Sequence, residues 1–313
     1  MHLWQIRQFP TKRENPRIWH IACILSIFTA GLLIPLRLSA QTDVETPADA
    51  NSPPQTQPLF EKAVAAIQSR KTIQATLVEQ VFIGDQPMRM TGQYVSRGDQ
   101  IHLELQVRLG GKTQGSLLEV SDGDILWSLT EIAGNKQVTL RNLKQIQAAM
   151  SEQPVATTWK TELGLGGLPG LMNSLHRTMQ FHEMREKGEG ASRSLILVGR
   201  WKKEVLAKWQ RPNEKELPPY FPEQVRIYLD PETLFPQRII YLKRDTEKKN
   251  YRSLVRLDFQ EVQLDHEVDD SLFEFTTPED LVPDDITQVY IDQFARRGPA
   301  ATEEKIPTSP PAR

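Results

Sequence analysis

The chain has 313 residues, with 38 basic and 40 acidic side chains, so its formal net charge is −2. This balance argues against a nucleic acid as the main partner, because phosphate binding needs clustered Lys and Arg. The single cysteine, Cys23, excludes an internal disulfide partner and a metal site built from several thiolates. The composition therefore favours a protein that is held together by a hydrophobic core.

Residues 1–40 have the layout of a secretory signal peptide. A basic stretch, Arg7–Arg17, precedes an apolar run, Ile21–Leu36, and Ala40 offers a small residue at a cleavage point. The run is shorter than the about 20 apolar residues of a transmembrane helix, and Pro35 interrupts it. We therefore expect secretion and a mature chain without cysteine, and an uncleaved membrane anchor is the alternative.

Two polar segments flank the part of the chain that can form a core. Residues 41–58 and 297–313 are rich in proline and cannot bury enough apolar surface to offset chain entropy, so we expect a disordered linker and a disordered tail. The intervening residues 59–296 fit one large β domain, or two small ones. Because no internal linker or repeat divides them, we expect one domain.

This domain begins with a predicted helix, Pro58–Arg70, and continues with strands. Ile101–Leu109 is the clearest strand, because apolar and polar residues alternate along it, as they do in an antiparallel strand with one buried face. The first six predicted strands are Thr72–Ile83, Met88–Ser96, Ile101–Leu109, Gln114–Val120, Ile125–Glu131 and Lys136–Arg141.

Helices are predicted in the middle of the domain, at Asn142–Glu152 and within Leu163–Gln180, where Pro169 suits the first helical turn. Strands then resume, and a sheet of about a dozen strands must curl, close or split. The expected fold is therefore mainly β, a curled antiparallel sheet with inserted helices. The later predicted strands are Phe181–Lys187, Ser194–Trp201, Gln224–Leu229, Gln237–Arg244, Ser253–Leu264 and Leu272–Thr276.

The acidic segment Leu264–Asp280 is a candidate metal site. A calcium loop needs Gly at its sixth position and Glu at its twelfth, whereas Asp270 and Thr276 stand there. We therefore interpret the segment as a solvated loop before a strand that Phe273 and Phe275 anchor by aromatic burial. The residues that do have the one-three-five spacing of a calcium loop are Asp265, Glu267 and Asp269.

No catalytic motif is complete in the sequence. Gly164 and Gly166 lack the third glycine of a dinucleotide loop, and no Gly-Lys-Ser/Thr follows them. The mature histidines are far apart and none has HExxH spacing, although a pair of carboxylates for glycoside hydrolysis stays open. We therefore expect a binding protein rather than an enzyme, with no cofactor and no metal.

Three local patterns together resemble the LolA-type carriers of outer-membrane lipoproteins. The most specific is Leu118–Trp127, which contains Val-Ser-Asp-Gly-x-x-Leu-Trp. Gly92–Ile101 is similar to a strand–turn–strand element of that family, and Asp270–Pro278 to its closing Phe-x-Phe-x-x-Pro. In that family an arginine and a proline end this element, whereas Arg97 is followed by Gly98 here. The resemblance covers about residues 59–285.

This resemblance implies an unclosed β-barrel with a helical lid over an apolar cavity that takes acyl chains. By position Arg97 matches an arginine that links barrel to lid. The implied compartment is the periplasm, and the implied partners are a lipid or acylated lipoprotein, an inner-membrane release complex and an outer-membrane acceptor. The apolar residues expected to line the cavity and lid are Met88, Met90, Leu103, Leu105, Trp127, Leu168, Leu171, Met172 and Leu175.

Two other functions stay open at the level of the sequence. One is an envelope-stress regulator or lipid sensor on the same fold, for which Lys187–Pro222, with Trp201 and Trp209, is the candidate partner surface. The other is a hydrolase that uses paired carboxylates. Ordinary core packing also accounts for each candidate lining residue, and fold analogy alone does not decide function.

Overall fold

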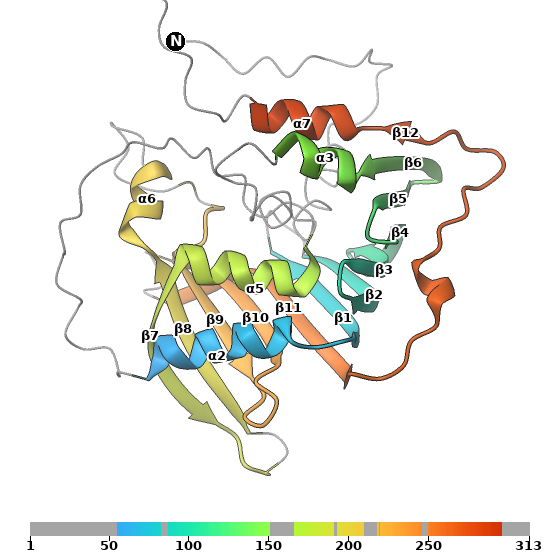
Figure 1. The fold of residues 1–313 in the computed structure, drawn as a ribbon. Helices are drawn as coiled ribbons and strands as arrows, with labels where there is room; N and C mark the ends of the chain where they lie inside the picture. Colours follow the sequence, from blue (N-terminus) through green and yellow to red (C-terminus); the bar gives the residue numbers. More distant parts are fainter. Residues whose placement is uncertain are drawn as a thin grey trace, which may run out of the picture.

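Strands dominate the described chain, and they form a single sheet (Figure 1). The computed structural model describes residues 55–82, 87–150, 166–190, 193–209, 218, 220–245 and 250–295. Within these residues the sheet has twelve strands, in the order β12-β6-β5-β4-β3-β2-β1-β11-β10-β9-β8-β7. Two meanders account for this order, one from β1 to β6 and one from β7 to β11.

Strands that follow one another in each meander pair in antiparallel fashion. The first meander consists of β1 (Ile73–Val81), β2 (Met88–Arg97), β3 (Gln100–Leu109), β4 (Lys112–Ser121), β5 (Ile125–Ile132) and β6 (Asn135–Asn142). The second consists of β7 (Met179–Lys187), β8 (Ser194–Trp201), β9 (Gln224–Leu229), β10 (Pro236–Asp245) and β11 (Asn250–Leu264). These eleven strands lie where the sequence predicts them, within a few residues at each end.

The first and last long strands, β1 and β11, join the two meanders. They pair in antiparallel fashion along most of β1, with Leu77 opposite Phe259. At the far edges lie β7 and the two-residue strand β12 (Asp284–Asp285), which pairs in parallel with β6. Because these edges do not pair with each other, the sheet stays open. The predicted mainly β fold, an unclosed and mostly antiparallel sheet, is confirmed.

Two helices, α2 (Thr56–Gln68) and α5 (Gly167–Thr178), lie side by side over one face of the sheet, called the inner face below (Figure 1). Side chains from both helices and from the inner face of most strands form one large apolar cluster. On the strands this cluster includes Leu77, Leu105 and Leu257, which period-two alternation directs to the same side.

A second, smaller core lies at the β6 edge of the sheet. There α3 (Leu143–Met150) packs against α7 (Thr287–Ala295), and Leu143, Ile146 and Met150 are buried with Leu126. The sequence predicts α3 but not α7. It also does not predict α6 (Lys203–Trp209), a helix inserted between β8 and β9. Both missed helices are short, with seven and nine residues.

One predicted strand, Leu272–Thr276, is wrong. Residues Asp270–Phe273 form a turn of 3₁₀-helix, η2, and the chain after it pairs with no strand. The local cause is Asp269, whose side chain accepts a hydrogen bond from the Ser271 N–H at 2.9 Å and so stabilises a turn instead of an extended start. α2 also begins at Thr56, two residues before the predicted helix.

The sheet makes close backbone contacts at Gly92 in β2. A Cβ atom at this position would lie 1.8 Å from the backbone oxygen of Glu104 in β3. No side chain fits at that distance, so only glycine lets the two strands approach in this way. Glycines of this kind are a means by which large sheets bend.

Replacement of Gly92 by alanine is therefore expected to destabilise the protein by about 1–3 kcal/mol, the usual cost of overpacking. Chemical denaturation of the purified variant measures this loss. Thr91→Ala, at the adjacent position of the same strand, is the matched control and should change the free energy of unfolding by less than about 0.5 kcal/mol. Equal stability of the two variants would contradict the steric explanation.

Candidate functional site

The inner face and its helix cover bring together most of the residues that the sequence singles out. Eight of the ten predicted side chains belong to one apolar cluster, seven of them buried and Leu171 partly buried. They come from β2, β3 and α5, which are far apart in the chain. These residues are Met88, Met90, Leu103, Leu105, Leu168, Leu171, Met172 and Leu175.

Methionine is prominent where α5 meets the sheet. Met88 and Met90 belong to the inner face of β2, Met172 to α5 and Met179 to the start of β7, and all four are buried in the same cluster. The thioether side chain is unbranched and flexible, so it adapts to neighbours of different shape. An interface of this composition can repack around an inserted apolar chain at low cost.

A buried hydrogen bond ties the start of α5 to the sheet. The Leu168 N–H donates a hydrogen bond to the hydroxyl oxygen of Tyr94 in β2, at 3.0 Å, and Tyr94 is fully buried. Beside it, Gly167 has a φ of +53°, and a Cβ there would lie 2.6 Å from that hydroxyl. Sequence analysis missed Tyr94, although it is in phase with Met88 and Met90 along β2.

The two covering helices are also tied to each other. Gln68 of α2 donates a hydrogen bond to Asn173 of α5 at 2.7 Å, and His176 of α5 lies 3.6 Å from Glu61 of α2. At the β7 edge, the rings of Phe60 and Phe181 pack with their centroids 3.9 Å apart. The helices therefore form a pair that covers the inner face together.

An acidic side chain, Glu79, lies within this apolar region. It is in phase with Leu77 on β1, only 1% of its surface is exposed, and its strand neighbours are Met90 and Leu257. Its Oε1 atom has no hydrogen-bond partner among the described residues. Burial raises the pKa of Glu79 to about 8, so the carboxyl is mostly uncharged at neutral pH.

A buried ion pair occupies another part of the inner face. Glu119 of β4 lies 3.5 Å from Arg141 of β6, and Ser128 of β5 bonds to both. Burial raises the pKa of Glu119, and the positive charge of Arg141 opposes the rise. The guanidinium also lies over the ring of Tyr290 in α7, at 5.6 Å. These contacts connect the smaller core to the sheet.

The two buried glutamates of the inner face are too far apart to act as a catalytic pair. Glu79 is on β1 and Glu119 on β4, so strand spacing alone separates them by roughly 14 Å. Glycoside hydrolysis uses carboxyl groups about 5–10 Å apart. Within the described ranges, no cluster of three or more His, Cys, Asp or Glu could hold a metal ion.

Two predicted site residues, Trp127 and Arg97, lie on the opposite, outer face. The indole of Trp127 is opposite Val120 and stacks on Phe275, with centroids 5.2 Å apart. Arg97 forms an ion pair with Asp270 at 2.6 Å, and its guanidinium lies 4.8 Å from the centre of the Phe273 ring. Both residues hold the closing segment of the chain against the sheet.

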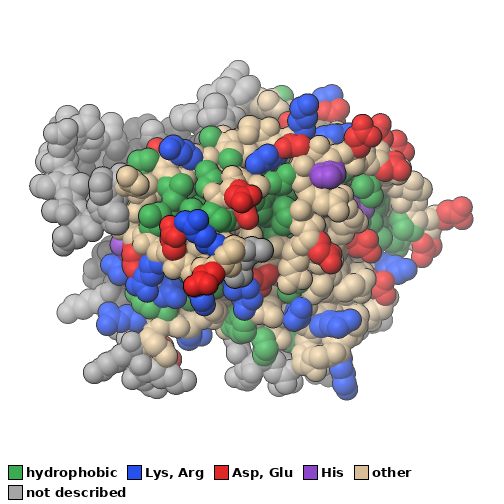
Figure 2. All heavy atoms as spheres, turned by 90° about the horizontal axis from the view of Figure 1, so that it is seen from below, with side chains coloured by type: hydrophobic (Ala, Val, Ile, Leu, Met, Phe, Trp, Pro, Cys, Tyr) green, Lys and Arg blue, Asp and Glu red, His purple; other side chains and the backbone are tan. Residues whose placement is uncertain are grey.

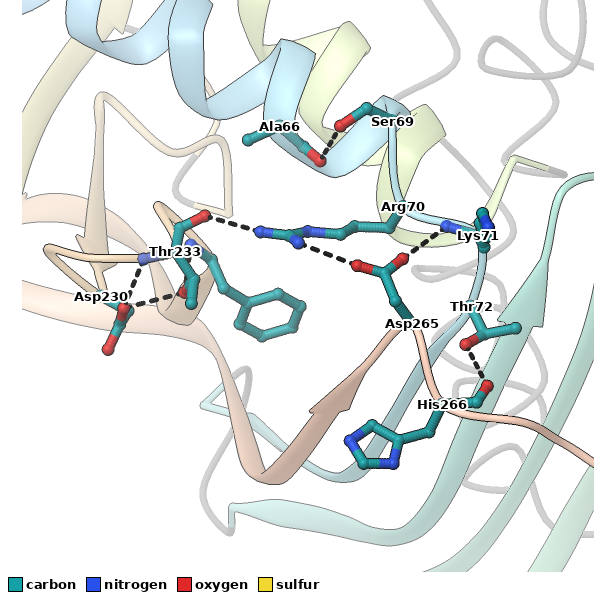
Figure 3. Close-up of polar contacts among 10 residues, drawn as sticks. Ala66, Ser69, Arg70, Lys71, Thr72, Asp230, Thr233, Asp265 and His266 are labelled. Carbon is teal, nitrogen blue, oxygen red and sulfur yellow. Dashed lines mark hydrogen bonds and ion pairs between the residues drawn. The ribbon is translucent and has the colours of Figure 1, made fainter.

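The first residues of the acidic segment also hold the closing part of the chain in place (Figure 3). Asp265 accepts hydrogen bonds from the Arg70 guanidinium at 2.9 Å and from the Lys71 N–H at 2.7 Å. These bonds hold the pKa of Asp265 below its usual value. Arg70 also donates to the Thr233 backbone oxygen at 3.3 Å. The carboxylate thus links α2, β11 and the β9–β10 turn, and it is a structural contact.

The outer surface carries two hollows. One, of about 500 Å³, includes Tyr228, Arg238 and Asp258 in its lining; another, of about 280 Å³, includes Arg200 and Arg226. Asp258 forms ion pairs with Arg238 and Arg256.

On the side of the molecule seen in Figure 2, basic and acidic side chains are interspersed with hydrophobic ones rather than gathered by sign.

No protein-family model matches the sequence, and no curated protein matches it significantly. Solved structures are similar to this chain at low identity and low TM-score. Lipoprotein LppX of Mycobacterium tuberculosis has a TM-score of 0.38 at 7% identity, over 70% of this chain and 99% of that one. A domain from Vibrio parahaemolyticus assigned to outer-membrane lipoprotein sorting has a TM-score of 0.31 at 9% identity, over 70% and 96%.

The MucA/MucB complex of Pseudomonas aeruginosa is a third similar structure, with a TM-score of 0.34 at 12% identity. The match covers 71% of this chain and 61% of that chain. At such identities the likeness concerns the fold alone. In the described part of the chain, no helix is both long enough and apolar enough to cross a bilayer. Residues 1–40, the predicted signal peptide, lie outside the described residues.

Glu79→Gln is expected to change how stability depends on pH. The pKa of about 8 keeps the carboxyl protonated in the folded protein up to about that pH, whereas in the unfolded chain the group has its ordinary pKa of 4.5. The unfolded state therefore binds fewer protons between these values, and wild-type stability should fall by about 1.4 kcal/mol per pH unit as pH rises through them. The variant lacks this contribution.

Urea denaturation at pH 5, 6.5 and 8 measures the difference. The free energy of unfolding of the variant, relative to wild type, should rise across the series. Glu104→Gln is the matched control, because Glu104 is an exposed glutamate on β3. Parallel pH profiles for wild type and Glu79→Gln would show that Glu79 is ionised in the folded protein.

Proposed function

We propose that this chain is a secreted, periplasmic carrier that holds the acyl chain of a lipid or lipoprotein between α5 and the inner face of the sheet. The observation that supports this most directly is the large apolar cluster between the helix pair and the inner face, to which β2, α5 and β7 contribute four buried methionines. It is large and apolar, and its cover is a helix pair rather than another sheet. An acyl chain needs no polar partner along its length, so no catalytic group is required.

The open sheet supports the entry of such a chain. The edges β7 and β12 are not paired with each other, and α5 is joined directly to the edge strand β7 at Met179. The start of α5 is held by the Tyr94 contact and by a glycine with positive φ. In the proposed carrier α5 moves away from β2 and β3 and returns over the bound acyl chain.

The free energy gained by burying an acyl chain and the free energy lost by displacing α5 are of similar size. Burial of an acyl chain of about 16 carbons is worth on the order of 12 kcal/mol, at about 0.8 kcal/mol for each methylene. Exposure of the three buried α5 side chains, Leu168, Met172 and Leu175, costs about 5–9 kcal/mol at about 1.5–3 kcal/mol each. A bound acyl chain can therefore offset displacement of the helix.

The regulatory alternative has less support from the described residues. Trp201, one of its two candidate contact residues, donates a hydrogen bond from its indole N–H to the Pro222 backbone oxygen at 2.6 Å and packs on Phe221. These contacts give it a structural role at the end of β8. A sensor would share the acyl site, so acyl binding is the first property to test.

Leu171→Glu is expected to weaken acyl binding. Leu171 packs against the cluster while remaining partly exposed, so a charge there enters the proposed acyl site without requiring full burial in the free protein. We expect at least a tenfold loss of affinity for a pyrene-labelled acyl chain, because an ionised group beside hydrocarbon is costly. Fluorescence titration measures it.

The matched control is Val289→Glu, because Val289 is exposed on α7. This helix packs against α3 and β6, whereas α5 packs against α2 and β7. The variant should bind the probe as wild type does. Mass spectrometry of the protein purified from its own host should in addition detect a co-purifying acylated molecule. Absence of probe binding by the wild-type protein would refute the carrier proposal.

Tyr94→Phe is expected to accelerate release of the bound probe. The substitution removes the hydroxyl that accepts from the Leu168 N–H and leaves that buried donor unpaired, which costs about 1–3 kcal/mol in the closed state. Stopped-flow displacement measures the release rate. Arg97→Leu provides the comparison: Arg97 contacts Asp270 on the outer face, so its loss should leave release unchanged. If Arg97→Leu accelerated release and Tyr94→Phe did not, Arg97 rather than Tyr94 would be the residue that holds the lid closed.

A further inference from the structure

We propose that Glu79 and the hydroxyl of Tyr241 bind the uncharged polar head of the acylated ligand, an ester or amide group, and disfavour ionised heads. This inference rests on the carrier function and names the class of ligand. It starts from a polar group that the acyl-chain proposal does not use: a carboxyl with one unpartnered oxygen in the apolar interior.

Glu79 and Tyr241 share the inner face of the sheet. Glu79 of β1 is opposite Leu257 of β11, and Tyr241 of β10 is opposite Val255, two positions along β11 from Leu257. The strands that carry the two side chains are roughly 10 Å apart. Both side chains are long, so a head group of a few atoms can reach both of them.

Their electrostatic coupling supports this proximity. Burial raises the pKa of Tyr241, and a negative charge on Glu79 raises it further. The strand neighbours of Glu79, Met90 and Leu257, are apolar. Within the described residues, the Oε1 atom of Glu79 has no hydrogen-bond partner. Burial without a partner is costly, so a ligand that supplies one gains affinity.

The chemistry of the two groups selects the head. A protonated carboxyl and a phenol each offer one O–H donor and further acceptor sites. An ester or amide carbonyl can accept from them, and an amide N–H or a glycerol hydroxyl can donate to the free Oε1. Neutral groups of this kind satisfy the site without bringing a charge into the apolar interior.

Ionised heads lack a counter-charge there. The next position of the inner face on β10 is Lys243, which is paired with Glu223 at 2.7 Å. The buried Arg141 of β6 is paired with Glu119 of β4. Strand β4 is three strands away from β1, on the side opposite to β11. A free carboxylate or phosphate would therefore lose hydration without gaining an ion pair. The site is expected to prefer an acylglycerol to the fatty acid with the same chain.

The test compares monooleoylglycerol, oleate and a synthetic N-acylated, C-amidated diacylglyceryl-cysteine peptide of uncharged sequence as competitors of the pyrene-labelled acyl probe. Wild type at pH 7 should bind the two neutral heads roughly tenfold more tightly than oleate, and Glu79→Leu should lose about that factor. Glu79→Gln keeps a donor and an acceptor and should retain the preference. Denaturation curves establish that both variants are folded.

A pH series gives a readout that a structural role would not change. Affinity of wild type for monooleoylglycerol should fall between pH 7 and pH 9.5, as Glu79 loses its proton, while Glu79→Gln stays constant. Tyr241→Phe should weaken the neutral heads and leave oleate unchanged. The tighter of the two neutral competitors identifies the source of the head, a free lipid or an acylated protein.

Two failures are distinguishable. If wild type binds no acylated probe, the carrier function fails, and the role of Glu79 fails with it. If wild type binds the probes but Glu79→Leu has the same head-group preference and the same pH profile, the carrier function stands and the assignment of Glu79 and Tyr241 is refuted.

Discussion

The antiparallel pairing of β1 with β11 is the contact on which the rest of the structure depends. It joins strands about 180 residues apart in the chain and turns two meanders into one sheet of twelve strands. A single sheet of this size has one continuous apolar face that needs cover. α2 precedes β1 directly and α5 precedes β7 directly, so both helices are available at the place where the inner face must be shielded from water.

The same pairing decides what lies on the outer face. β11 ends beside the start of β1, and the chain that follows crosses the outer side of β3 and β4 as η2. There the Phe273 ring lies under the Arg97 guanidinium and the Phe275 ring stacks on Trp127. The outer face is thus closed at one end by the chain itself, whereas the inner face is closed by a separate pair of helices.

The interior combines adaptable packing with a few polar groups. Most of the cluster is aliphatic or thioether. Two acidic groups differ in their contacts: Glu119 is paired with Arg141, whereas one oxygen of Glu79 has no partner among the residues that the structure describes. A paired buried charge serves the fold, while an unpaired carboxyl in an apolar site reduces stability unless something else binds it. This contrast directs the functional proposal to Glu79.

Local patterns were sufficient to predict most elements, because alternation and helical spacing are properties of neighbouring residues. Ile101–Leu109 is the clearest case, and the prediction for it is confirmed almost residue for residue. The same patterns failed at Leu272–Thr276, where two alternating phenylalanines predict a strand. There the turn formed by Asp269 and the contacts of Phe273 and Phe275 with the outer face replace strand pairing.

The candidate site shows the same division between local and distant information. The sequence by itself determined a mainly β chain with two central helices, and it selected Met88, Met90 and the leucines of α5 as apolar side chains of one phase. Only the tertiary structure decided that these residues meet, that Trp127 and Arg97 face the other way, and that Tyr94 and Glu79 belong to the interior. The physical reason is that the face of a strand, and the partner a side chain meets there, depend on strand order and register, which distant parts of the chain set together.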